Sequence, residues 1–166
     1  MPLDANDQQI IQEALARGGS VWDDATLEPV KRKIKQYYRD NGGEQCCYCR
    51  REMRDEFNMV IDIEHVLPKS LFRDFMFELF NLNISCKRCN MRIKKERTDF
   101  LVDQATIAAN ANQSDQYLMV HPTWITIMLT LTTWLTSTIP KRRSSIYKKL
   151  PREILPILSL SWKKLR

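Results

Sequence analysis

The sequence predicts a small zinc-stabilised α+β domain, with helices before the zinc-bound core and an irregular extension after it. Three observations carry this prediction: two helix-like segments near the start, two Cys-x-x-Cys pairs, and two short strand-like segments between those pairs. With 166 residues, 43% of them hydrophobic and 28% charged, the chain suits one folded domain with a modest core. We divide it into a helical region (1–45), a zinc-stabilised core (46–100) and a basic, apolar extension (101–166).

The N-terminal region should contain two helices. The first is expected over residues 7–17, where apolar side chains recur on one face and Gly18-Gly19 follows. The second is expected over residues 27–38, with Pro29 in its first turn, where a missing N–H costs nothing. The residues expected on its buried face are Val30, Ile34, Tyr37 and Tyr38.

The core should contain two strands and a helix. Residues 59–65 and 82–85 have the β-branched composition of strands. Residues 71–80, between them, are rich in Phe and Leu and should pack beneath the site. Residues 87–97 are dominated by Arg, Lys, Met and Glu, which predicts a short basic helix.

The end of the chain has a different composition. Seven of the sixteen residues in 123–138 are Thr, interleaved with apolar residues. This pattern allows a strand pair, a membrane segment, or an atypical or frameshifted C-terminus, and the short, hydroxyl-rich run disfavours the membrane.

The net charge of +6 is concentrated at the same end of the chain. Residues 1–115 hold 17 Lys and Arg against 19 Asp and Glu, whereas residues 116–166 hold nine against one. A basic tail of this kind suits a polyanion such as nucleic acid, with a solvated or partner-docking tail as the alternative.

The cysteines predict a structural zinc site. Cys46 and Cys49 form one Cys-x-x-Cys pair, and Cys86 and Cys89 form the second. Two such pairs complete a tetrahedral shell of sulfurs around Zn²⁺, which leaves no open position for chemistry. The zinc is therefore expected to hold the fold together, as a small domain needs.

The fifth cysteine, Cys47, is interpreted as a non-ligand, because replacing Cys46 with it would leave the less common Cys-x-Cys spacing. Redox chemistry at one pair is the alternative, but it does not explain two pairs. The polar, acidic start of the chain lacks the features of a signal peptide, so we expect a cytoplasmic location.

An acid and a histidine lie between the two cysteine pairs. Glu64 and His65 end the first expected strand, and His65 has the pKa range to take a proton from water. Adjacent strand residues point to opposite faces, so both can reach one site only where the strand bends. Asp62 shares the strand face of Glu64 and is assigned a supporting place. His121 has no identifiable partner and is interpreted as structural.

These residues form two longer motifs. Residues 62–70 read Asp-x-Glu-His-x-x-Pro-Lys-Ser, and residues 81–94 read Asn-Leu-x-x-x-Cys-x-x-Cys-Asn-x-x-x-Lys. Together they resemble the HNH endonucleases with a ββα-metal core, over about 50 residues from 46 to 95. In that family an acid, a histidine and asparagines hydrolyse phosphodiester bonds with the help of a divalent ion.

The resemblance implies roles for four residues. His65 would be the general base, and Asn81 would order the loop and orient that histidine. Glu64, where the family usually has Asp, and Asn90, where many members have a final His, would hold a catalytic Mg²⁺ or Mn²⁺. The alternative for the two asparagines is an ordinary turn or helix-cap role.

Five basic residues surround the expected centre and are candidates for phosphate binding, with a solvated helix face as the alternative. They are Lys69, Arg88, Arg92, Lys94 and Lys95.

Within this group the chain resembles the small nucleases of bacterial Septu and retron-linked anti-phage systems, on Glu-His-x-x-Pro-Lys-Ser (64–70) and Asn-Leu-x-x-Ser-Cys-Lys-x-Cys-Asn (81–90). The resemblance implies a defence complex with an ABC-like ATPase partner and retron components, acting on DNA or RNA. The alternative is a catalytically silent zinc module that docks a partner protein or holds nucleic acid. Such a module would not need Glu64, His65 and Asn90 together.

Overall fold

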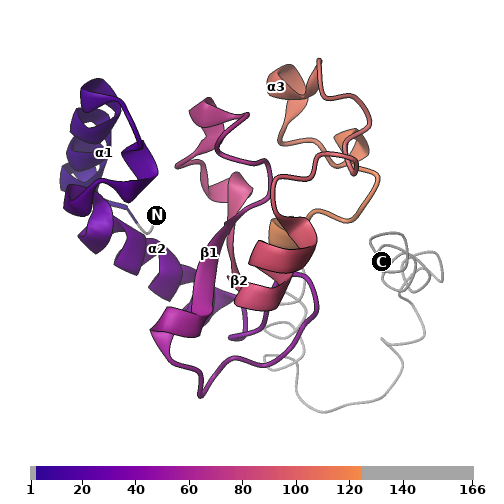
Figure 1. Ribbon diagram of the computed structural model, residues 1–166, viewed down its shortest axis with the longest axis horizontal. Helices are drawn as coiled ribbons and strands as arrows, with labels where there is room; N and C mark the ends of the chain where they lie inside the picture. Colours follow the sequence, from indigo (N-terminus) through magenta and orange to yellow (C-terminus); the bar gives the residue numbers. More distant parts are fainter. Residues whose placement is uncertain (1–2, 125–166) are drawn as a thin grey trace, which may run out of the picture.

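The computed structural model describes residues 3–124, which fold as a mixed α+β domain. Short 3-10 turns connect the main elements. In chain order, the main elements are α1 (Ala5–Arg17), α2 (Glu28–Asn41), β1 (Ile61–His65), β2 (Leu82–Cys86), a π-helix (Arg88–Lys94) and α3 (Ile107–Asn110), shown in Figure 1.

The first predicted helix is confirmed as α1, which begins two residues earlier than expected. Asp4 lies at its N-cap and accepts a hydrogen bond from the backbone N–H of Asp7, while the Asp7 carboxylate accepts one from Asp4. This capping box satisfies N–H groups that the first turn leaves unpaired. Ile11 and Ala14 face the core, and the chain leaves the helix at Gly18, where φ is +77°.

The second predicted helix is confirmed as α2, which runs to Asn41 rather than Tyr38. Its buried face consists of Val30, Ile34 and Tyr38, whereas Tyr37, expected inside, is partly exposed. The Tyr38 hydroxyl donates to the backbone carbonyl of Leu79, which ties α2 to the turn before β2.

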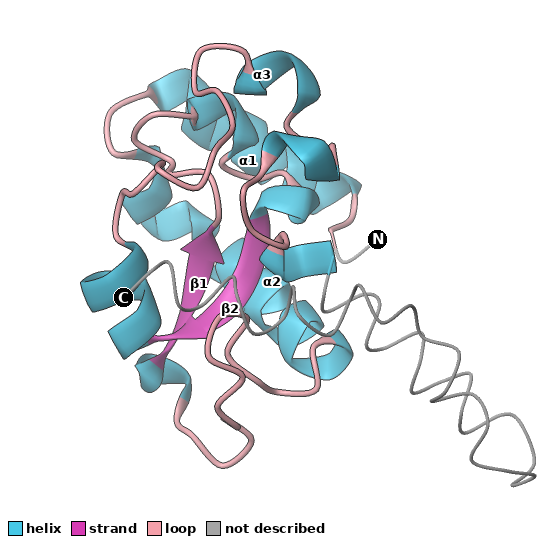
Figure 2. Ribbon diagram, turned by 90° about the vertical axis from the view of Figure 1, so that its right-hand side faces the viewer, coloured by secondary structure: helices cyan, strands magenta, loops and turns pink. Residues whose placement is uncertain are grey.

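The two predicted strands are confirmed as an antiparallel pair, β1 and β2. Ile61 pairs with Cys86 at one end and His65 with Leu82 at the other. Residues 59–60, expected in the first strand, belong to a 3-10 turn. Helix α2 packs against both strands (Figure 2). Every residue of β2 is buried.

The segment after β2 is helical, as its composition predicted, but it is a π-helix that ends at Lys94. Lys95 stops it by adopting a φ of +49°, a conformation that non-glycine residues adopt infrequently. The segment 71–80 forms two short 3-10 turns, and its Phe72, Phe75 and Phe80 pack against buried residues that follow β1 and the π-helix.

One hydrophobic cluster joins α1, α2 and both strands, so buried residues of 1–45 and of 46–100 belong to the same core. The division of the chain at residues 45 and 100 stays a prediction. Interpretations of the Thr-rich stretch concern residues outside the described part, except for the Thr123 and Trp124 that precede the undescribed residues. Within residues 3–124, no helix is long and apolar enough to cross a membrane.

Candidate metal centre and adjoining pocket

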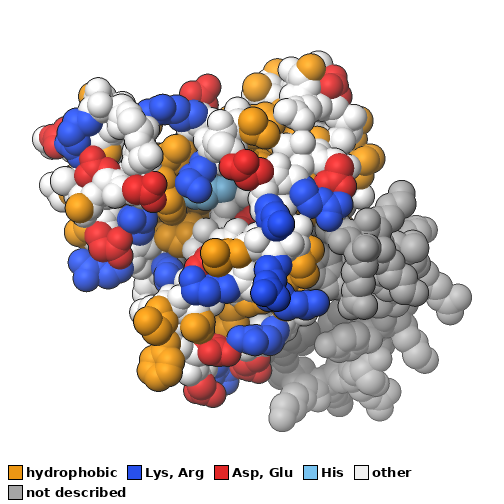
Figure 3. All heavy atoms as spheres, viewed as in Figure 1, with side chains coloured by type: hydrophobic (Ala, Val, Ile, Leu, Met, Phe, Trp, Pro, Cys, Tyr) orange, Lys and Arg blue, Asp and Glu red, His pale blue; other side chains and the backbone are white. Residues whose placement is uncertain are grey.

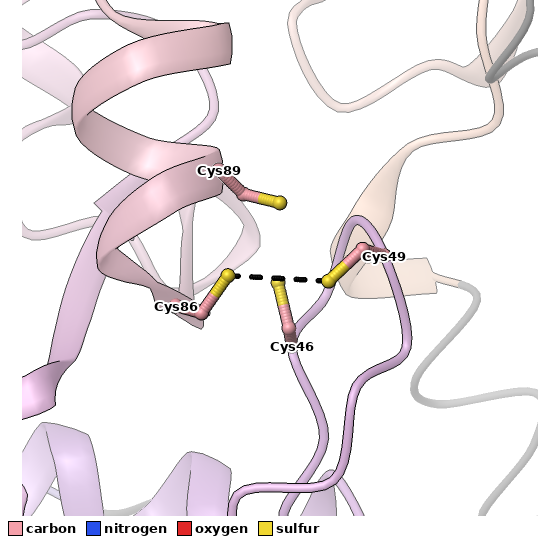
Figure 4. Close-up of side chains that lie close together, drawn as sticks. All are labelled: Cys46, Cys49, Cys86 and Cys89. Atoms are coloured by element: carbon pink, nitrogen blue, oxygen red, sulfur yellow. Dashed lines mark hydrogen bonds between the residues drawn. The ribbon is translucent and has the colours of Figure 1, made fainter.

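The four cysteines of the two Cys-x-x-Cys pairs meet at one point. Their sulfurs all lie within 4.8 Å of one another, and the sulfurs of Cys49 and Cys86 are 3.9 Å apart. A tetrahedron with Zn–S distances of 2.3 Å has sulfurs roughly 3.8 Å apart, so the observed spacing suits a zinc ion. Figure 4 shows Cys46 and Cys49 approaching from one loop, and Cys86 and Cys89 from the end of β2 and the π-helix.

Three of these thiols differ in how readily they ionise. Burial raises the pKa of the Cys49 and Cys89 thiols, whereas the hydrogen bond with Cys47 lowers the pKa of Cys46 to about 4. A bound cation would displace the remaining protons, since thiolates are the metal ligands. The all-sulfur donor set therefore fits zinc in a structural site.

Cys47 lies outside this four-sulfur set, as the spacing predicted. It is buried, and its backbone N–H donates to the carbonyl of Ile84 in β2 over 3.0 Å. Cys47 therefore anchors the first cysteine loop to the sheet through its backbone.

A pocket of about 830 Å³ lies beside β1 and brings several predicted site residues together. Its lining includes Asp62, Glu64, His65, Lys69 and Asn90. The other wall comes from α2 and from Trp22, which precedes that helix. Figure 3 shows this face of the molecule, hollowed between α2 and the later segments, with basic side chains around the hollow.

His65 is held firmly on two sides. Its Nε2 lies 3.0 Å from the backbone carbonyl of Met76, and its ring meets that of Trp22 edge to face, with centroids 4.4 Å apart. Burial, followed by the nearby charge of Lys69, lowers the pKa of His65 to about 4. The ring is therefore neutral at pH 7, and because a carbonyl only accepts, Nε2 carries the proton and Nδ1 is the basic nitrogen.

The carboxylate of Glu64 is buried, with 1% exposure. The hydroxyl of Tyr48 donates to Oε1 over 2.9 Å, and the ammonium of Lys94 lies 3.5 Å from the same oxygen. Burial raises the pKa of Glu64 to about 7, because it outweighs the opposing effects of Lys94 and Tyr48. Sequence reasoning missed Tyr48, although its place inside the first Cys-x-x-Cys pair was a usable signal.

Both Glu64 and His65 line the pocket although they are adjacent in β1. His65 is the last residue of the strand, and the chain then turns into a loop. Asn81 holds that loop: its Oδ1 accepts from the N–H of Leu67 over 2.6 Å, and its Nδ2 donates to the Leu67 carbonyl over 3.1 Å. The structure thus places Asn81 against the loop after the histidine, and its amide hydrogen-bonds to Leu67 and Phe75 within residues 3–124.

Asn90 lies at the pocket but contacts Asp62 rather than Glu64. Its Nδ2 donates to the Asp62 carboxylate over 3.1 Å, and Lys87 pairs with the other carboxylate oxygen over 3.1 Å. Sequence reasoning assigned Asp62 only a supporting place, and the two-residue alternation along β1 was the signal for a larger one.

The five basic candidates do not form one set. Lys69 and Lys95 line the pocket, whereas Arg88 and Arg92 are exposed outside it. Lys94 is 4% exposed, and its ammonium contacts Glu64 and the His65 carbonyl, so it is not presented to a surface ligand. Its position at the end of a basic helical run gave no sign of this burial.

These features define a small α+β domain with a zinc-capable cysteine cluster next to a pocket containing an acid and a neutral histidine. The chain is 33% identical over 84 residues to the Septu protein PtuB of Bacillus thuringiensis. This similarity covers 51% of the chain and 30% of the relative, so the chain matches less than a third of that protein's length. No family model matches the chain, and no solved structure is detectably similar to it.

Proposed function

We propose that this protein is a metal-dependent endonuclease of the HNH type that hydrolyses phosphodiester bonds in nucleic acid. The observation that carries the proposal is His65, a buried and neutral imidazole that lines a pocket together with carboxylates and an amide. A buried histidine needed only for packing would not require a pocket, acids and basic side chains around it.

His65 acts as the general base. With Nε2 engaged by the Met76 carbonyl, Nδ1 is the nitrogen that takes a proton from the attacking water. The edge-to-face contact with Trp22 restricts rotation of the ring, so the imidazole is oriented before substrate arrives.

Oxygen donors at the same pocket would hold a catalytic Mg²⁺ or Mn²⁺. Glu64 and Asn90 are the proposed ligands, and the contact between Asn90 and Asp62 adds a second carboxylate close to that position. Hard divalent cations prefer such oxygen ligands. When bound, the ion would neutralise charge on the phosphate during hydrolysis. The hydrogen bond from Tyr48 and the ion pair with Lys94 hold the Glu64 carboxylate in place.

Zinc has a separate, structural role in this proposal. The four sulfurs of Cys46, Cys49, Cys86 and Cys89 complete its shell, so no position is open for water or substrate. The ion would link the loop before β1 to the end of β2 and to the π-helix, whose Asn90 lines the pocket.

The similarity to a Septu protein supports a place in a bacterial anti-phage defence system. We propose that the nuclease is the effector of a cytoplasmic complex, with an ABC-like ATPase and retron components as candidate partners. The gene neighbourhood tests this directly, because an adjacent ATPase or reverse transcriptase gene would support a complex. A solitary gene in every genome that carries it would argue for a free-standing endonuclease.

Activity is tested with purified protein, alone and with its genomic neighbour, on plasmid DNA and on RNA with Mg²⁺ or Mn²⁺. Cleavage by the wild type that is lost in His65→Ala supports the assignment. Equal activity of the two proteins, or equal inertness under every condition, rejects His65 as the base.

A second candidate is a catalytically silent zinc module that binds nucleic acid or a partner protein. One observation favours it: Lys94 already supplies a cation to Glu64, at 3.5 Å, where a divalent ion would otherwise be needed. Metal titration separates the two candidates. A silent module would bind its partner equally well with and without Mg²⁺ and would cleave nothing.

A further inference from the structure

One wall of the pocket beside β1 is basic and is formed by α2, outside the cysteine-containing segment 46–100. Helix α2 contributes Lys31, Arg32, Lys33 and Lys35 to its lining. Across the pocket, Lys69 lies in the loop after β1 and Lys95 follows the π-helix. Six basic and four acidic side chains therefore line the pocket.

All three lysines of α2 are already engaged within the protein. Lys31 pairs with Glu28 over 3.1 Å and donates to the Trp22 carbonyl. Lys33 pairs with Asp4 and Asp7 at 3.0 and 2.8 Å. The ammonium of Lys35 donates to the Asn58 carbonyl over 3.0 Å. These side chains contribute to the structure of the wall.

Three basic side chains of the pocket are different. Arg32, Lys69 and Lys95 are exposed, and among residues 3–124 none of them forms a side-chain hydrogen bond or an ion pair. They come from three separate elements and converge on the pocket that contains His65. Free cations converging from separate elements indicate an anionic ligand that bridges them.

The charges within the pocket are also ordered. Two of the four acids, Asp62 and Glu64, belong to β1 and are 20% and 1% exposed. The other two, Glu28 and Glu96, are exposed like the three free cations, and Glu28 is paired with Lys31. Recessed acids repel an anion from the base of the pocket, and exposed cations attract it at the entrance. A chain of phosphates, with one phosphate over the acids and its neighbours at the cations, matches this arrangement.

We propose that the groove between α2 and the segment following the π-helix binds the phosphate backbone of nucleic acid, with Arg32 as a phosphate contact on the wall opposite Lys69 and Lys95. The guanidinium of Arg32 suits this role, since its planar donors match phosphate oxygens. This inference rests on the nucleic-acid substrate of the proposed nuclease, and it adds a binding residue outside the resemblance motifs.

The test measures binding without cleavage. In a His65→Ala background, fluorescence anisotropy follows binding of short labelled single-stranded and duplex DNA and RNA over a range of salt concentrations. Arg32→Glu is compared with Arg73→Glu, because Arg73 is also an exposed arginine without an ion pair in the described residues and lies at a different pocket. Arg32→Gln is the milder variant, and zinc content and thermal melting verify folding.

We expect Arg32→Glu to weaken binding about tenfold or more. The slope of the logarithm of the binding constant against the logarithm of the salt concentration should fall by the amount expected for about one to two phosphate contacts. Arg32→Gln should have a smaller effect in the same direction, and Arg73→Glu should stay within about twofold of the background protein. Which of the four probes binds identifies the form of nucleic acid.

Equal effects of Arg32→Glu and Arg73→Glu, or binding to none of the four probes, would overturn the proposal. These results are separable from the fate of the nuclease. Cleavage by the wild type together with unchanged binding in Arg32→Glu rejects the groove and keeps the enzyme. An Arg32-dependent interaction without any cleavage keeps the groove and rejects the enzyme.

Discussion

The cysteine cluster and the pocket beside β1 are neighbouring polar sites that differ in the kinds of donor they contain and in how open they are. The cluster contains four donors of one kind, and three of the four cysteines are buried. The pocket contains carboxylates, an amide, an imidazole and free cations around an open volume of about 830 Å³. A uniform, closed donor set satisfies one ion and stabilises a fold, whereas a mixed, open set leaves positions for water and substrate.

Two side chains connect these sites. Tyr48 lies between the cysteines of the first pair, and Lys94 ends the π-helix that carries Cys89. Both contact the carboxylate of Glu64. A disturbance of the cluster should therefore reach the pocket, while a change at the pocket should leave the cluster intact.

The largest effect is expected at the cluster. Replacing Cys86 by Ser should abolish zinc binding and the folded state, since structural zinc contributes about 10–16 kcal/mol of apparent binding free energy. Metal analysis and circular dichroism measure this, with about one zinc per wild-type chain expected. Cys47→Ser is the control, because Cys47 lies outside the four-sulfur set and should retain the zinc.

A folded, zinc-free Cys86→Ser protein would show that the cluster is not structural. Loss of zinc in Cys47→Ser would place the fifth cysteine among the ligands.

The next effect is confined to the pocket. His65→Ala should lower the rate of phosphodiester cleavage by about 10²- to 10⁴-fold, because general base catalysis is lost, while zinc content stays at the wild-type value. His121→Phe is the control: His121 is buried among aromatic rings, and its nitrogens have no hydrogen-bond partner in residues 3–124. A comparable loss of activity in His121→Phe would break the distinction between the two histidines.

Acid should affect metal binding at the pocket through Glu64. The pKa of this carboxyl is raised to about 7 by burial, so below pH 7 it is increasingly protonated and cannot ligate a cation. The Mg²⁺ concentration for half-maximal activity should therefore rise about tenfold per pH unit below pH 7, as one proton competes with the ion. Cleavage assays over a Mg²⁺ series from pH 5.5 to 8, with zinc content monitored, measure this. A midpoint independent of pH would remove Glu64 from the ligands.

The smallest effect tests the connection between the sites. Tyr48→Phe removes one hydrogen bond to Glu64, which should cost about 1 kcal/mol and lower cleavage about fivefold without loss of zinc. Tyr38→Phe is the matched control, because it removes a hydroxyl bonded to the Leu79 carbonyl in the core. The control should lose stability in a thermal melt and retain activity. Full activity in Tyr48→Phe together with lost activity in Tyr38→Phe would show that Tyr48 does not connect the cysteine cluster to the pocket.

Local patterns in the sequence were sufficient for the main elements and for the zinc-capable cysteine cluster. Apolar periodicity identified α1 and α2, and β-branched composition identified β1 and β2, although capping at Asp4 extended the first helix. The Cys-x-x-Cys spacing identified all four sulfurs, because a two-residue spacer itself directs both side chains toward one ion.

Packing between distant segments decided the rest. The contact of Asn90 with Asp62, the burial of Lys94 against Glu64 and the place of Arg32 on the pocket wall all join residues that are far apart in the chain. From the sequence alone, a lysine in a basic run is expected to be solvated. Its burial is favourable only when a partner such as the buried carboxylate of Glu64 lies beside it, because a buried charge must be paired. The cysteine spacing therefore marked where a metal ion can be held. Only the packing of α2 and the π-helix around β1 formed the pocket with its basic rim.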